Sequence, residues 1–225
     1  SKIADVVICN KISFSNKSYT SSAAAIISEY LTKETTSQAS IASQVTIVDL
    51  SDIIASRMED EGLKVLEKVS NTFKNSNLVD VDLSDNAMGS KGISACMSVL
   101  GSQRGSLERL SLCNNGLSET SMAEIADILT FEEEINDGYG SLHISICDRL
   151  KKLHFFNNMS GNNGCKAFVL ILDKCSTSLE DVRFSSTRAG KQGSLLISSA
   201  LEKLGKEKLQ NLKRLDLADN SFGLE

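Results

Sequence analysis

The sequence is built on one short pattern that recurs along most of its length. In its clearest copy, Leu107–Leu117 (LERLSLCNNGL), apolar residues occupy positions 1, 4, 6 and 11, and an asparagine occupies position 9. Alternate side chains of a strand point to opposite faces, so positions 4 and 6 indicate a strand with one buried face. The asparagine predicts a turn in which its amide bonds backbone groups of neighbouring copies. Such a chain folds by stacking similar units.

Copies of this pattern recur at long intervals. A first strand is predicted within KISFSNKSY, where Ile12 and Phe14 alternate with polar residues. Six later units begin at Val45, Leu78, Leu107, Leu150, Leu179 and Leu212. Their starts are 33, 29, 43, 29 and 33 residues apart. Helical spacing of apolar residues follows the turns, as across Ile93–Leu100. The pattern is therefore typical of leucine-rich repeats whose units are long enough for a full helix.

These units predict an α/β fold class: a leucine-rich repeat solenoid, similar to ribonuclease inhibitor, with a curved parallel sheet inside and helices outside. One unit cannot bury its own apolar face, so neighbours stack into a continuous core. We expect residues 1–225 to form one domain of about seven units. Because the chain lacks an initiator methionine and stops within the seventh unit, we also expect the parent protein to extend beyond both ends.

One unit is longer than the others. It spans 43 residues, and its extra material lies around Phe131–Asp148 (FEEEINDGYGSLHISICD). We expect an extended helix followed by a loop over one edge of the array. Two interpretations stay open: a contact surface specific to this family, or an insertion that the loop simply tolerates.

Composition narrows the possible functions. The net charge of −5 and the pI near 5.2 disfavour nucleic acid as a partner and suit a partner with a basic face. No apolar run approaches the roughly 20 residues that cross a bilayer, so direct membrane insertion is not expected. The six cysteines form no CxxC pair and the only histidines are His143 and His154. Reduced thiols, with Cys96 on the buried face of a helix, are therefore expected rather than a metal site.

Motifs for catalysis are absent from the sequence. It contains no GxxxxGK[ST], GxSxG or HExxH, and no glycine-rich loop that opens a helix after a strand. We therefore predict a binding protein rather than an enzyme, and no cofactor.

The outward-facing positions show two polar surfaces. Position 8, on the loop that leaves each strand, holds Asp52, Asp85, Asn114, Asn157, Ser186 and Asp219. Positions 3, 5 and 7 should face the concave side, which is acidic in the early units and mixed to basic in the later ones. The early residues are Asp49, Asp80 and Asp82, and the later ones are Lys152, His154, Asp181, Arg183, Arg214 and Asp216. Either a basic partner is attracted to the first half, or these side chains are simply solvated.

Several blocks go beyond what stacking requires. They are DLSDIIASRMEDEGLKVL, DLSDNAMGSKGI, LSLCNNGL, LHFFNNMSGNNG, FSSTRAG and LDLADNSFG. Together they resemble the leucine-rich repeat domain of Ran GTPase-activating proteins, and the last three, with ISFSNKSYTSSAA, look most like the plant-type branch. The resemblance runs from about Ile12 to Gly223. Its more specific parts are the loop at Arg57, the NNG at Asn114–Gly116 and the NNMSG and SSTR blocks.

The resemblance implies a protein that binds GTP-bound Ran, alone or together with a Ran-binding protein, and accelerates its GTP hydrolysis. The family is understood to orient Ran's own catalytic glutamine without inserting an arginine. Its asparagine corresponds to Asn114, and its arginine corresponds to Arg57, which would anchor the interface by pairing with acidic groups. Asp85 and Asn157 are further candidates for partner contact. The implied role is nucleocytoplasmic transport, in the cytoplasm and at the nuclear envelope.

One residue departs from the family's pattern. Ser56 precedes Arg57 where relatives often have glycine, so a loop that needs positive φ would be affected. The alternative to GTPase activation is a ribonuclease-inhibitor-like interaction scaffold, which would bind through the concave sheet and leave GTPases unaffected.

Overall fold

The computed structural model describes residues 9–34, 39–136, 141–205 and 207–221. Seven short strands there form one parallel sheet whose order follows the chain. They are β1 (Lys11–Ser13), β2 (Ile47–Asp49), β3 (Asp80–Asp82), β4 (Arg109–Ser111), β7 (Lys152–His154), β8 (Asp181–Arg183) and β9 (Arg214–Asp216). Six of them begin two residues after a predicted unit start, and β1 lies within the predicted first strand region, so the repeat pattern located all seven.

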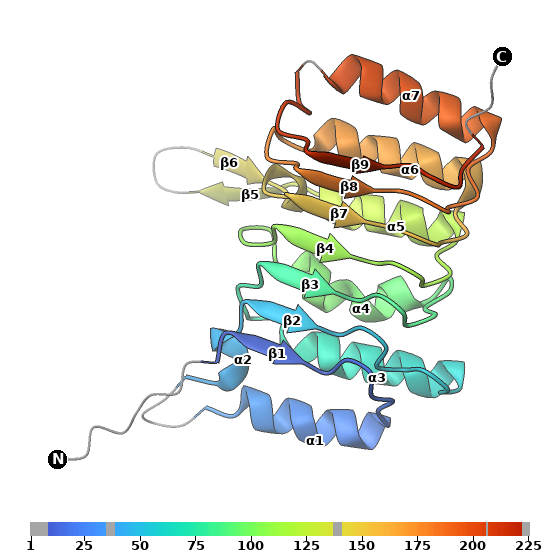
Figure 1. The fold of residues 1–225 in the computed structure, drawn as a ribbon. Coiled ribbons are helices and arrows are strands. Elements are labelled where there is room, and N and C mark those ends of the chain that lie inside the picture. The colour runs from blue at the N-terminus through green and yellow to red at the C-terminus, as the bar shows by residue number, and fades with distance from the viewer. Residues whose placement is uncertain (1–8, 35–38, 137–140, 206, 222–225) are drawn as a thin grey trace.

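Helices cover one face of this sheet, and Figure 1 shows the two layers running side by side along the array. The helices are α1 (Ser21–Thr32), α2 (Ile41–Gln44), α3 (Glu59–Thr72), α4 (Gly92–Gly101), α5 (Glu119–Thr130), α6 (Gly161–Lys174) and α7 (Lys191–Gly205). In the described residues, none of the helices is both long and apolar enough to cross a membrane. The predicted α/β solenoid is confirmed.

The core lies between the sheet and the helices. Position 4 of each repeat unit, in the middle of its strand, is in register with position 4 of the next unit, as in the pair Val81 and Leu110. In the clearest copy, positions 1, 4, 6 and 11 are all fully buried. Cys96 is buried as predicted, and burial raises the pKa of its thiol to about 12. Removing such rows of apolar side chains from water is the main stabilising contribution in stacked repeats.

A ladder of buried asparagines joins the turns, as the pattern predicted for position 9. The Oδ1 atom of Asn115 accepts from the backbone N–H of Asn86 at 2.8 Å, and its Nδ2 donates to the Leu83 carbonyl oxygen at 3.0 Å. Asn158 repeats this one unit later, since its Oδ1 accepts from the backbone N–H of Asn115 at 3.1 Å. The ladder satisfies backbone groups that the turn would otherwise leave buried without partners.

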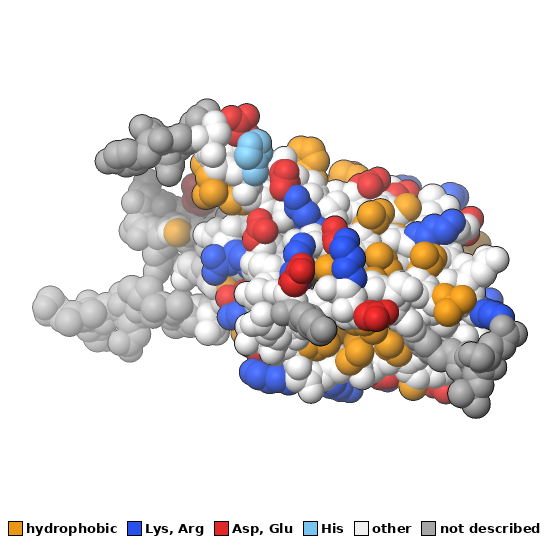
Figure 2. Space-filling model, turned by 90° about the horizontal axis from the view of Figure 1, so that it is seen from above, with side chains coloured by type: hydrophobic (Ala, Val, Ile, Leu, Met, Phe, Trp, Pro, Cys, Tyr) orange, Lys and Arg blue, Asp and Glu red, His pale blue; other side chains and the backbone are white. Residues whose placement is uncertain are grey.

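The long unit differs from the sequence prediction. The expected extension of the helix is wrong: α5 ends at Thr130, and an antiparallel hairpin of β5 (Glu133–Asn136) and β6 (Ser141–Ile144) follows. A 3₁₀ turn, η1 (Ile146–Asp148), leads back to the sheet. Three consecutive glutamates after Phe131 would lie at the negative end of a longer helix, which disfavours continuing it. The hairpin projects from the side of the array (Figures 1 and 2).

The β9 end is less covered than the middle. Leu215, at position 4 of β9, is 42% exposed, whereas the equivalent Val182 of β8 is 1% exposed. Seen from this end, apolar side chains lie uncovered among charged ones (Figure 2). Within the described residues, β9 is paired on one side only.

Candidate functional site on the rim of the sheet

Position 8 of every unit has the same unusual backbone conformation. These residues all have φ between 52° and 63°, in the left-handed region. They are Asn16, Asp52, Asp85, Asn114, Asn157, Ser186 and Asp219. Asparagine and aspartate tolerate this region better than most residues because their short polar side chains bond locally. The sharp turn therefore explains why one rim of the sheet carries a column of short polar side chains.

Asn114 lies in the middle of this column and is exposed. Its backbone N–H donates to the Phe156 carbonyl oxygen at 2.7 Å. Its Nδ2 donates to Oδ1 of Asp85 at 2.8 Å, and its Oδ1 accepts from Nδ2 of Asn157 at 2.8 Å. Three of the four residues that the sequence indicated thus lie in contact on adjacent units. The next residue, Asn115, is fully buried.

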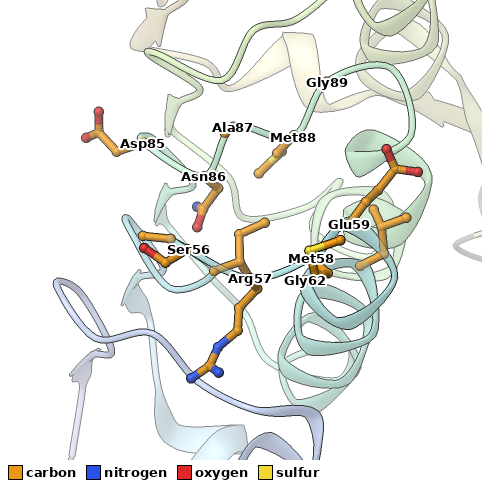
Figure 3. A pocket seen from close by; sticks show the side chains of 13 residues that line it. Ser56, Arg57, Met58, Glu59, Gly62, Asp85, Asn86, Ala87, Met88 and Gly89 are labelled. Atoms are coloured by element: carbon orange, nitrogen blue, oxygen red, sulfur yellow. The ribbon is translucent and has the colours of Figure 1, made fainter.

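Arg57 lies apart from these three. It is exposed in the loop between β2 and α3, and Figure 3 shows its side chain directed away from Asp85. Its Nη2 donates to the carbonyl oxygen of Ser18 at 2.8 Å, in the loop after β1. Ser56 has a φ of 62°, so the conformation for which a glycine would be favoured is present here with serine. The arginine therefore keeps its loop position and braces two neighbouring units.

A hollow of about 430 Å³ lies between this loop and the turn after β3 (Figure 3). Its lining includes Arg57, Met58, Glu59, Asp85 and Met88. Met58 is 82% exposed, although it occupies the N-cap position of α3. Sequence reasoning missed Met58. The available signal was an apolar residue directly before three acidic ones, where a polar cap is usual.

Comparison with known proteins gives this arrangement a family context. A family model for leucine-rich repeats matches residues 74–95 and 208–225. The fold is a leucine-rich repeat solenoid. Over 102 residues the chain is 44% identical to RAN GTPase-activating protein 1 of Arabidopsis thaliana. This matched stretch covers 45% of this chain and 18% of the relative. It is 41% identical over 100 residues to RAN GTPase-activating protein 2 of the same plant, covering 44% and 17%.

The resemblance drawn from the sequence blocks is thereby confirmed. The matched stretch spans less than a fifth of either relative, so what those proteins do as a whole is considered below as a proposal.

The concave face of this leucine-rich repeat solenoid differs between its halves. In the first half, Asp49 accepts hydrogen bonds from Ser51 at 2.6 Å and from Ser13 at 3.0 Å. Burial raises the pKa of Asp49, but these hydrogen bonds outweigh it, and the pKa lies below the ordinary value. Burial raises the pKa of Asp80 more than the nearby Lys152 and Arg109 lower it. The early carboxylates therefore have unlike environments.

In the second half of the concave face, charged and polar side chains of neighbouring strands contact one another. Nε2 of His154 lies 2.9 Å from Oδ1 of Asp181. Nε of Arg183 donates to Oδ2 of Asp216 at 2.8 Å, and its guanidinium lies 3.7 Å from the centre of the Phe156 ring. Because Arg183 is already paired within the sheet and burial lowers the pKa of His154, this half has less charge to offer a partner than its sequence indicates.

Proposed function

We propose that this chain is a GTPase-activating module that binds Ran in its GTP-bound form and stimulates hydrolysis by orienting Ran's own catalytic glutamine. The similarity to two proteins named as RAN GTPase-activating proteins supports the choice of activity and partner. The observation that carries the mechanism is the exposed amide of Asn114 on the rim, between Asp85 and Asn157.

An amide suits this role for a physical reason. Hydrolysis by such GTPases depends on positioning the attacking water and stabilising charge on the phosphoryl group. A partner glutamine needs one donor and one acceptor to be fixed in place. Each side-chain amide has two N–H groups and two lone pairs. After its contacts within the rim, Asn114 retains one of each for a partner.

Arg57 would serve the interface rather than the reaction. Its guanidinium is bonded to Ser18, which supports a role in holding the rim loop in shape for docking. In this proposal the complex forms in the cytoplasm and at the nuclear envelope, with Ran alone or with a Ran-binding protein, and supports nucleocytoplasmic transport.

Single-turnover GTP hydrolysis by Ran, with and without the chain, tests the proposal. We expect strong acceleration by the wild type. Asn114→Ala should lower the saturating rate about a hundredfold, the loss typical of one preorganised polar contact in a transition state, while binding persists. Arg57→Ala should weaken complex formation. Unchanged hydrolysis in the presence of the intact chain would contradict the proposal.

The scaffold alternative predicts binding through the concave sheet. Its strongest support is the acidic first half, where Asp80 and Asp82 lie on adjacent positions of one face. Asp82→Ala separates the two functions, because it should weaken a scaffold but leave Ran hydrolysis unchanged. Full acceleration by Asp82→Ala together with loss in Asn114→Ala would exclude the scaffold interpretation.

A further inference from the structure

The rim side chains of three consecutive units form a directed chain of hydrogen bonds. Asn157 donates to Asn114 at 2.8 Å, and Asn114 donates to Asp85 at 2.8 Å. All three side chains are exposed, yet each is bonded along the column. A carboxylate can only accept, so Asp85 fixes the nitrogen of the Asn114 amide on its own side. Asn157 then meets the amide oxygen.

This direction matters because an amide has two ends of similar shape and opposite hydrogen-bonding character. An exposed asparagine without such partners samples both orientations, since rotation about its terminal torsion is weakly restricted. Here the reverse orientation would place the Asn114 oxygen against the Asp85 carboxylate and its NH₂ against the NH₂ of Asn157. The contact with Asp85 would be repulsive whichever way the Asn157 amide turns, so the chain selects one orientation before any partner arrives.

From this geometry we propose that Asp85 and Asn157 are positioning residues, which fix the direction in which Asn114 presents its free N–H and its free lone pair. The inference rests on the proposed function of Asn114. It gives Asp85 and Asn157 a role besides the partner contact expected from the sequence. Preorganised polar groups contribute most where their orientation does not have to be established during the reaction.

A double exchange tests this directly. In Asp85→Asn/Asn157→Asp the residue types and the net charge are retained, but the acceptor-only group lies at the opposite end. The chain should then run in reverse, and Asn114 should present its donor where its acceptor was. We expect the saturating single-turnover rate to fall about tenfold or more, with the half-saturating concentration changed by less than about threefold.

The matched control is Asp219→Asn. It is the same chemical change at position 8, in a unit whose rim side chain contacts Ser186 rather than Asn114. It should retain the wild-type rate. A double exchange with a saturating rate within about twofold of the wild type would overturn the positioning role. If the wild type itself does not accelerate hydrolysis, the proposed function fails first, and the positioning role fails with it.

A measurement without Ran checks the orientation even if a variant folds poorly. The side-chain NH₂ resonances of Asn114, identified by their absence in Asn114→Asp, should shift when the neighbouring carboxylate is protonated in acid. The same shift should be lost in Asp85→Asn. An Asn114 resonance that is insensitive to acid in the wild type would overturn the inference independently of any rate.

Discussion

At the scale of single residues, the adjacent side chains of Asn114 and Asn115 have opposite environments. The side chain of Asn115 is fully buried and bonds the backbone of the preceding unit, whereas the side chain of Asn114 is exposed and bonds side chains of the rim. The repeat pattern predicted this difference because position 9 must satisfy buried backbone groups and position 8 need not. It could not predict the bonds between Asp85, Asn114 and Asn157, because these depend on rotamers in units 29 and 43 residues apart.

The two asparagines should therefore differ sharply on truncation. Asn115→Ala removes the acceptor of the Asn86 N–H and the donor to Leu83 in a buried site, so we expect a loss of about 3 kcal/mol in the free energy of unfolding. Asn114→Ala should cost less than about 1 kcal/mol because water replaces its partners. Urea denaturation measures both. Equal losses in the two variants would show that the rim contributes to stability as much as the ladder does.

At the scale of elements, the helix and strand positions followed from periodicity, but the long unit did not. Its glutamates and its isoleucine and leucine fit either a helix or a hairpin when read alone. The structure resolves this because Ile135 is directly opposite Leu142 in the hairpin, so both side chains lie on one face. The register between two strands depends on which residues pair across the turn. A short stretch of sequence read by itself does not give this pairing. Residues 137–140, between the strands, lie outside the described part of the chain.

The buried histidine of β7 should make stability depend on pH. Burial lowers the pKa of His154 below its ordinary value, although Asp181 partly opposes this. The folded protein therefore binds fewer protons than the unfolded chain. Its contribution to stability is fully present above the unfolded pKa, near 6.5, and is lost as the pH falls through the folded pKa.

Unfolding measured at about pH 7.5 and about pH 5.5, above the range where ordinary carboxyls titrate, isolates this effect. The free energy of unfolding should fall more in the wild type than in His154→Gln. His143→Gln is the matched control, because His143 is exposed on the hairpin. If His143→Gln removed the pH dependence instead, the effect would come from the hairpin and not from His154.

At the scale of the whole molecule, the repeat pattern predicted the architecture because every unit contacts mainly its neighbours. Local rules therefore extend along the array, and Val48, Val81 and Leu110 occupy equivalent buried positions. The distribution of charge was harder to predict. The basic residues of the later strands were visible in the sequence, but the pairing of Arg183 with Asp216 depends on strand order and side-chain direction.

The β9 end should promote self-association of the 225-residue chain. Leu215 is 42% exposed on a strand paired on one side only within the described residues, and an open strand edge pairs readily with another chain. Leu215→Lys should weaken association about tenfold, as expected for losing the burial of one leucine. Sedimentation at increasing concentration measures this. Leu170→Lys, at an exposed leucine of α6, should have no such effect, and an equal effect there would place the contact on the helices.

The left-handed turn at position 8 has a consequence for how such a surface can change over generations. Because the backbone there disfavours bulky and β-branched side chains, few residue types are tolerated: asparagine, aspartate, serine and glycine are the most favourable. Each of these side chains except that of glycine can form hydrogen bonds. Substitutions at position 8 therefore exchange one donor or acceptor for another at a regular place on the rim of the sheet. Single substitutions at these positions can therefore change which partner groups the rim recognises, while the stacked sheet and helices stay the same.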